Sequence, residues 1–112
     1  MIPTVYVILF LAILAETAGT TALQASQQFT RPLPSVIVVL AYGISFYLLA
    51  LALRTMPVGV VYAIWSGLGI VFIAALGYVI FGQKLDLAAV LGIGLILAGI
   101  VVIQLFSRSA PH

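Results

Sequence analysis

Long apolar runs alternate with short polar breaks along the 112-residue chain. Each run is about as long as a helix that crosses the hydrocarbon core of a bilayer, which takes about 20 residues. Membrane β-strands alternate polar and apolar residues, whereas these runs are continuously apolar. Because lipid offers no hydrogen bonds to the backbone, only helices or a closed barrel can span it. The pattern therefore predicts an all-α membrane protein with helices over residues 4–23, 35–53, 58–81 and 87–106.

The composition agrees with burial in lipid. Apolar residues make up 65% of the chain and charged residues only 5%, against about 25% charged in ordinary soluble domains. Six charged side chains cannot cover the surface of a water-soluble domain of this length. The net charge of +2 is small and scattered, so we expect no nucleic-acid partner. The first apolar run is longer than the core of a signal peptide, and we expect it to remain as a span.

The breaks between the runs carry helix-end signals. Pro57 suits the first turn of a helix, Gly82 suits a C-cap and Asp86 suits an N-cap. No break is long enough for a soluble domain, so residues 1–112 are expected to form one four-helix transmembrane domain. Such short connections place successive helices antiparallel.

Basic residues are balanced between the two ends of the predicted bundle. Arg31 and Lys84 fall on one side, and Arg54 and Arg108 fall on the other. Because an excess of Lys and Arg normally fixes the orientation of a membrane protein, this balance predicts weak or dual topology. The alternative is that the first span fixes one orientation by itself.

Glu16 is the single acidic or basic residue within a predicted span. A carboxylate at this depth costs about 2.5–3.5 kcal/mol on insertion scales, and such residues usually serve function. Desolvation favours the neutral acid, so a carboxyl here can exchange a proton for a cation. The small neighbours Ala12, Gly19 and Thr20 leave room beside it. The alternative is a structural hydrogen bond or a protonated side chain without a role.

Aromatic and hydroxyl side chains share helix faces in the second and third spans. Tyr42, Ser45 and Phe46 lie on one face of the second, and Tyr62 and Trp65 on one face of the third. Ring faces attract an organic cation by about 0.5–2 kcal/mol each. Interfacial belts are the usual alternative for membrane aromatics, but Trp65 lies well inside its span.

Glycines suggest where helices bend and associate. Gly67 and Gly69 weaken the middle of the third span and permit a bend. Gly92 and Gly99, seven residues apart on one face of the fourth span, permit close approach of another helix. Tight packing is the alternative for Gly67 and Gly69. A dimer of eight helices would bring together two copies of Glu16.

Four segments resemble the small multidrug resistance (SMR) family, and the likeness covers essentially the whole chain. They are AETAGTT at 15–21, PVGVVYAIWSGLG at 57–69, FGQKLD at 81–86 and LFSRS at 105–109. The closest likeness is to its quaternary-ammonium and multidrug exporter branch. The resemblance implies an antiparallel, dual-topology homodimer in the bacterial inner membrane. It also implies proton-coupled export of lipophilic, often aromatic or quaternary ammonium cations. A transporter of this kind is not an enzyme and needs no cofactor or metal.

The resemblance also implies roles for single residues. Glu16 matches the glutamate at which proton and drug compete. The other matches are site aromatics at Tyr42, Tyr62 and Trp65, nearby pocket positions at Ser45 and Phe46, a bend at Gly67 and Gly69, and a dimerisation motif at Gly92 and Gly99. Gln24 departs from the Lys that is usual in this branch, which bears on substrate range and loop electrostatics more than on mechanism.

Other functions fit the same residues. The same scaffold could transport guanidinium, polyamines or a lipid-linked substrate. A non-transporting membrane subunit would use Glu16 to contact a partner helix, and a passive pore would conduct without proton counterflow. Transport by the purified protein alone separates these classes.

Overall fold

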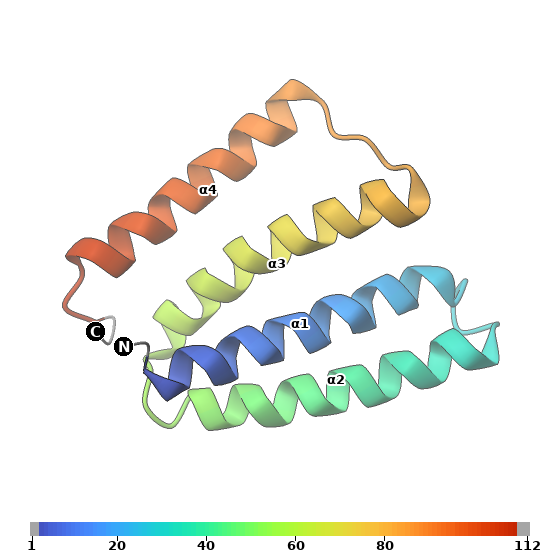
Figure 1. Ribbon diagram of the computed structural model, residues 1–112, viewed down its shortest axis with the longest axis horizontal. Coiled ribbons are helices and arrows are strands. Elements are labelled where there is room, and N and C mark those ends of the chain that lie inside the picture. Colours follow the sequence, from blue (N-terminus) through green and yellow to red (C-terminus); the bar gives the residue numbers. More distant parts are fainter. Residues whose placement is uncertain (1–2, 110–112) are drawn as a thin grey trace.

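The computed structural model of the protein describes residues 3–109, so Met1, Ile2 and the last three residues of the polar tail lie outside it. Over the described range the chain forms four α-helices and no strand (Figure 1). They are α1 (Thr4–Ala25), α2 (Pro32–Ala52), α3 (Val58–Phe81) and α4 (Leu87–Phe106). Each is long and apolar enough to cross a membrane. The predicted all-α class with four spans is confirmed.

The helix bounds lie close to those expected from the apolar runs. α3 and α4 begin and end at the expected residues, whereas α1 continues to Ala25 and α2 begins at Pro32. A proline can occupy the first turn because an N–H group there has no intrahelical partner. The break before α2 is therefore shorter than the sequence pattern suggested.

Two of the three helix-end predictions are confirmed. Gly82 ends α3 in the left-handed conformation, with a φ of 67°, which costs glycine little because it has no Cβ. Asp86 caps α4, since its carboxylate accepts a hydrogen bond of 2.9 Å from the Ala89 N–H. Pro57 lies one residue before α3 as its N-cap, rather than in its first turn.

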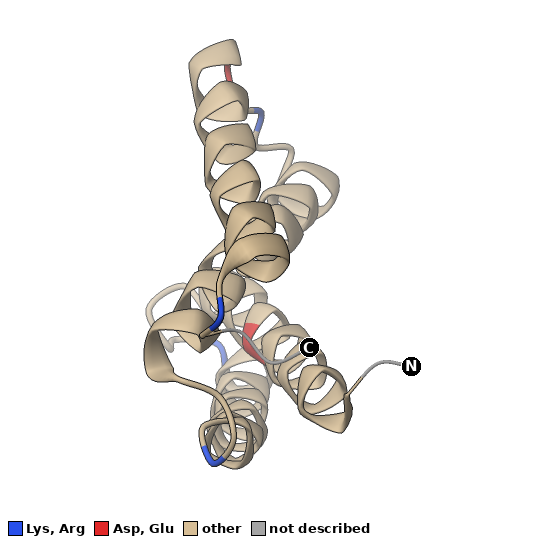
Figure 2. Cartoon of the chain, turned by 90° about the vertical axis from the view of Figure 1, so that its left-hand side faces the viewer, with Lys and Arg blue, Asp and Glu red and all other residues tan. Residues whose placement is uncertain are grey.

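The helices pack in a chain of contacts. α1 lies along α2, α3 packs on α1, and α4 has extensive contacts with α3 alone. Figure 1 shows α4 set apart from α1 and α2 on the far side of α3. No residue of α4 is buried. Most of the ribbon between the ends of the helices carries no charge (Figure 2), as expected of surfaces that face lipid.

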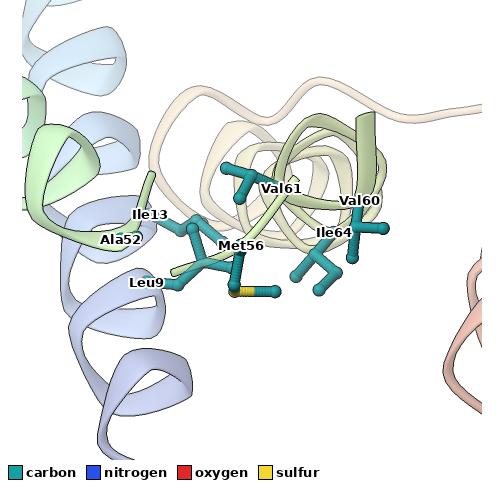
Figure 3. Packing of buried hydrophobic residues seen from close by; sticks show 7 residues of the cluster. All are labelled: Leu9, Ile13, Ala52, Met56, Val60, Val61 and Ile64. Atoms are coloured by element: carbon teal, nitrogen blue, oxygen red, sulfur yellow. The ribbon is translucent and has the colours of Figure 1, made fainter. Parts of the chain in front are cut away.

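The buried core joins the first three helices at one end of the bundle (Figure 3). It consists of Leu9, Ile13, Ala52, Met56, Val60, Val61 and Ile64. The short α2–α3 connection contributes Met56, which is only 3% exposed. This cluster fixes α3 against α1, and thereby sets the distance between the functional side chains of these two helices.

The connection between α1 and α2 has an unusual backbone. Gln27, Gln28 and Phe29 have φ angles of 49°, 62° and 64°, and this left-handed region costs residues with a Cβ roughly 1–2 kcal/mol each. The buried Ser26 hydroxyl offsets part of this cost. It donates to the Leu23 carbonyl at 2.7 Å and accepts from the Phe29 N–H at 3.1 Å.

Gly67 lies where α4 crosses α3. A Cβ at this position would run into Cδ1 of Ile100 and would approach Cδ2 of Leu97 to 3.5 Å. α3 continues without a break through Gly67 and Gly69, so the bend at these residues stays a prediction. What the geometry shows is a close helix contact that the absence of a side chain permits.

Gly67→Ala should therefore loosen the attachment of α4. Because Cδ1 is the far end of the flexible, half-buried Ile100 side chain, the cost should be about 1 kcal/mol, the lower end of the range for overpacking. Unfolding of the detergent-solubilised protein in SDS would measure it. Gly94→Ala on α4 is the matched control, because its Cβ would meet nothing within 4 Å. Adding Ile100→Val, which removes Cδ1, should restore much of the loss. Equal stability of the Gly67 and Gly94 variants would contradict this account.

Candidate functional site

Glu16 borders two cavities. One, of about 350 Å³, lies between α1, α2 and α3. The other, of about 440 Å³, lies between α1, α3, α4 and the α3–α4 connection. Glu16 and Trp65 line both. The half-buried carboxyl on α1 thus faces the space between the helices as well as the outer surface of the bundle.

The first cavity, here called the aromatic cavity, gathers most of the predicted site. Its lining consists of Glu16, Tyr42, Phe46, Leu49, Val61, Tyr62 and Trp65. The Tyr42 and Phe46 rings stack, with centroids 5.9 Å apart and planes 20° from parallel. Four aromatic residues and one carboxyl therefore share a single space. Tyr62 is still 71% exposed, so this side of the cavity is open in a single chain.

A chain of hydroxyls leads from Tyr42 to Glu16. The Thr20 hydroxyl donates to Oε1 of Glu16 at 3.1 Å and lies 2.6 Å from the Tyr42 hydroxyl. Threonine has a single O–H hydrogen. When Thr20 gives it to the carboxylate, Tyr42 must donate to Thr20. Thr20 had been predicted only to leave room beside Glu16. Its spacing of four residues from Glu16 places it on the same helix face and is the signal for this contact.

Gly19 makes the position of Tyr42 possible. A Cβ on Gly19 would lie 2.7 Å from Cδ1 and from Cε1 of the Tyr42 ring, and 3.3 Å from the Ala41 Cβ. The ring therefore rests directly on the α1 backbone. Any side chain at this position would displace the ring and separate its hydroxyl from Thr20.

Gly19→Ala should accordingly weaken cation binding without unfolding the protein. Losing one ring of the cavity would cost about 2- to 30-fold in affinity, since a cation–π contact contributes about 0.5–2 kcal/mol. Titration of the detergent-solubilised protein with tetraphenylphosphonium measures this. Gly43→Ala is the matched control, because that position on α2 has nothing within 4 Å of the added methyl. Equal affinities of the two variants would show that the ring position is unimportant.

Ser45 does not line either cavity. It is fully buried between α1 and α2, where its hydroxyl donates to the Ala12 carbonyl at 2.8 Å. Of the three α2 residues predicted at the site, Tyr42 and Phe46 line the aromatic cavity and Ser45 does not. The geometry gives Ser45 a contact that holds the two helices together.

The glycines predicted to mediate assembly lie on an uncovered surface of the chain. A Cβ on Gly92 or Gly99 would meet nothing within 4 Å. Gly69 lines the cavity next to α4. Among residues 3–109, no cluster of His, Cys, Asp and Glu side chains could hold a metal ion.

The chain is similar to known multidrug transporters over nearly its whole length. The family model described as Small Multidrug Resistance protein matches residues 4–96. A multidrug transporter of Pseudomonas aeruginosa is 55% identical over 97% of the chain and 99% of its own length. The multidrug transporter EmrE of Escherichia coli is 52% identical, and the quaternary ammonium compound-resistance protein QacF of Klebsiella aerogenes 48% identical. Each of these two alignments covers 96% of this chain and 97% of the relative.

Proposed function

The chain belongs to the small multidrug resistance family, and from this premise we propose that it exports lipophilic and quaternary ammonium cations in exchange for protons. It is a multi-pass transporter of the bacterial inner membrane and not an enzyme. The names of its relatives support multidrug efflux as the broad activity. We propose in addition that Glu16 binds both the proton and the cation.

The observation that carries the proposal is the position of Glu16 in the aromatic cavity. No other acidic or basic residue lies in the four helices. An organic cation in this cavity would meet one carboxylate and the rings of Tyr42, Phe46, Tyr62 and Trp65. The carboxylate supplies the countercharge, and each well-placed ring adds about 0.5–2 kcal/mol. A cavity of this chemistry favours cations that are too apolar to be strongly hydrated.

Competition between a proton and an organic cation for the Glu16 carboxyl couples the movement of one to the movement of the other. A protonated Glu16 carries no charge to pair with a cation, and a cation-bound Glu16 gains nothing from a proton. Each ligand therefore displaces the other, and a proton gradient shifts the protein toward cation release on the acidic side. Thr20 holds one oxygen of the carboxyl toward Tyr42, so that the exchange takes place at the wall of the cavity.

We further propose that the working unit is an antiparallel homodimer. In a single chain the aromatic cavity is open beside Tyr62, and α4 buries none of its residues. The uncovered Gly92 and Gly99 would let a second α4 approach closely. The balanced basic residues would allow both orientations in one membrane. Two chains would then enclose one chamber between two Glu16 carboxyls.

Transport by the purified protein in liposomes tests the function. With an acidic interior, ethidium should accumulate inside while protons leave, and a protonophore should abolish the accumulation. Equilibration that stops at equal concentrations, without proton movement, would indicate a passive pore. No movement of ethidium, of an alkylammonium or of guanidinium would indicate a subunit that does not transport. Either result would refute the proposed exchange.

A further inference from the structure

The second cavity beside Glu16, here called the α3–α4 groove, follows one face of α3 from Trp65 to Gly77. Ser66, Gly69, Ile73 and Gly77 line it, and their spacings of three and four residues place them on one side of α3. Trp65 and Gly77 are twelve residues apart, which corresponds to roughly 18 Å along a helix. The groove therefore starts at Glu16 and Trp65 and ends beside the α3–α4 connection.

The walls of the groove are apolar along most of this distance. Ile70, Ile73 and Ala74 on α3 and Ile93 on α4 line the space, and Leu85 contributes to it from the α3–α4 connection. The polar groups lie toward its ends, with Glu16 and Ser66 at one and Gln83 at the other. Gln83 stays near the backbone there, since a Cβ on Gly77 would lie 3.0 Å from its Oε1. A single carboxyl thus stands at the head of a long apolar space.

We propose that the α3–α4 groove binds the alkyl chain of a cationic amphiphile whose ammonium group pairs with Glu16. The inference rests on the proposed function and specifies its substrates. Compact aromatic cations occupy the aromatic cavity alone, whereas a long-chain quaternary ammonium places its head at Glu16 and its chain along α3. Trp65, which lines both spaces, separates the two modes of binding.

A cationic amphiphile fits the groove better than a membrane phospholipid does. The anionic phosphate of a phospholipid would be repelled by the Glu16 carboxylate. The lipid head group also lies at the membrane surface, about 15 Å from the centre of a hydrocarbon core about 30 Å thick, whereas Glu16 lies within α1. A quaternary ammonium brings the opposite charge to this depth, and its chain then has an apolar space to fill.

Chain length should consequently govern affinity. Burial of one methylene group contributes about 0.8 kcal/mol, or about fourfold in affinity. Affinity should rise in this way from butyl- through octyl- to dodecyltrimethylammonium until the groove is filled. Partition of the longer chains into detergent affects every variant equally, so ratios between variants isolate the contribution of the groove.

Ala74→Leu tests the proposal, because Ala74 lines the groove and a leucine there would occupy its middle. Ala50→Leu on α2 is the matched control, since the exposed Ala50 lines neither the groove nor the aromatic cavity. Each probe would be used to displace radiolabelled tetraphenylphosphonium from the detergent-solubilised protein. If leucine displaces two methylenes of the substrate, Ala74→Leu should lower affinity for the dodecyl probe about 15-fold. Affinities for the butyl probe and for tetraphenylphosphonium should change less than twofold.

The possible outcomes separate the inference from the proposed function. A wild-type protein that binds neither tetraphenylphosphonium nor any alkylammonium refutes the function itself. Intact tetraphenylphosphonium binding with the same chain-length preference in both leucine variants overturns the groove, which a lipid or a second chain would then cover. If Ala74→Leu binds nothing at all, Ile73→Ala replaces it. Removing that wall should weaken binding of the dodecyl probe selectively, and an unchanged preference would again overturn the proposal.

Discussion

Replacing Glu16 with glutamine should abolish proton-driven cation export by the reconstituted protein. The amide has nearly the same shape and can still accept the hydrogen bond that Thr20 donates at 3.1 Å. It cannot carry a negative charge or take up a proton at neutral pH. At a separation of 4 Å and an effective dielectric constant of 20, an ion pair is worth about 4 kcal/mol, which corresponds to about a thousandfold in cation affinity. Uptake of ethidium into acid-loaded liposomes measures export, and titration in detergent measures binding.

Glu16→Asp provides the matched control for this substitution. It keeps the carboxyl and shortens the side chain by one methylene, so it should retain coupled transport with a changed pH dependence. Binding to the wild-type protein should release a proton and should weaken as the pH falls. Neither effect should remain in the glutamine variant. Uphill accumulation of ethidium by that variant would refute the assignment of Glu16.

The helices followed from sequence because the bilayer leaves few alternatives. Apolar runs of span length must be helical in lipid. Gly82 ends α3 and Asp86 caps the start of α4, as their residue types predicted. The gathering of Tyr42, Phe46, Tyr62 and Trp65 around Glu16 agrees with the faces deduced from helical spacing and with the family resemblance. Short connections helped here, since they leave neighbouring helices little freedom of arrangement.

Other features depended on contacts that spacing alone does not determine. Ser45 shares a broad face with Tyr42 and Phe46, but the rotation of α2 turns its hydroxyl toward the Ala12 carbonyl. The left-handed backbone over 27–29 could not be predicted, because these three residues include no glycine. It depends on hydrogen bonds to the buried Ser26. The α3–α4 groove depends on the angle at which α4 leaves α3. Apart from Gln104, whose side chain accepts a hydrogen bond from Tyr6 at 3.0 Å, α4 is apolar on all sides, so its apolar residues do not reveal which face packs.

Trp65→Ala should have the second largest effect, because Trp65 lines both cavities at Glu16. Its indole offers the strongest cation–π surface among the aromatic side chains, worth up to about 2 kcal/mol when desolvated. Loss of this ring should weaken binding of tetraphenylphosphonium about 10- to 30-fold. It should also lower affinity for dodecyltrimethylammonium, whereas Ala74→Leu should affect only the latter. Trp65→Phe should retain most of the binding, since it keeps a ring in place. Unchanged affinity for both probes in the alanine variant would limit Trp65 to helix packing. It would contradict a role for this ring in binding cations in either cavity.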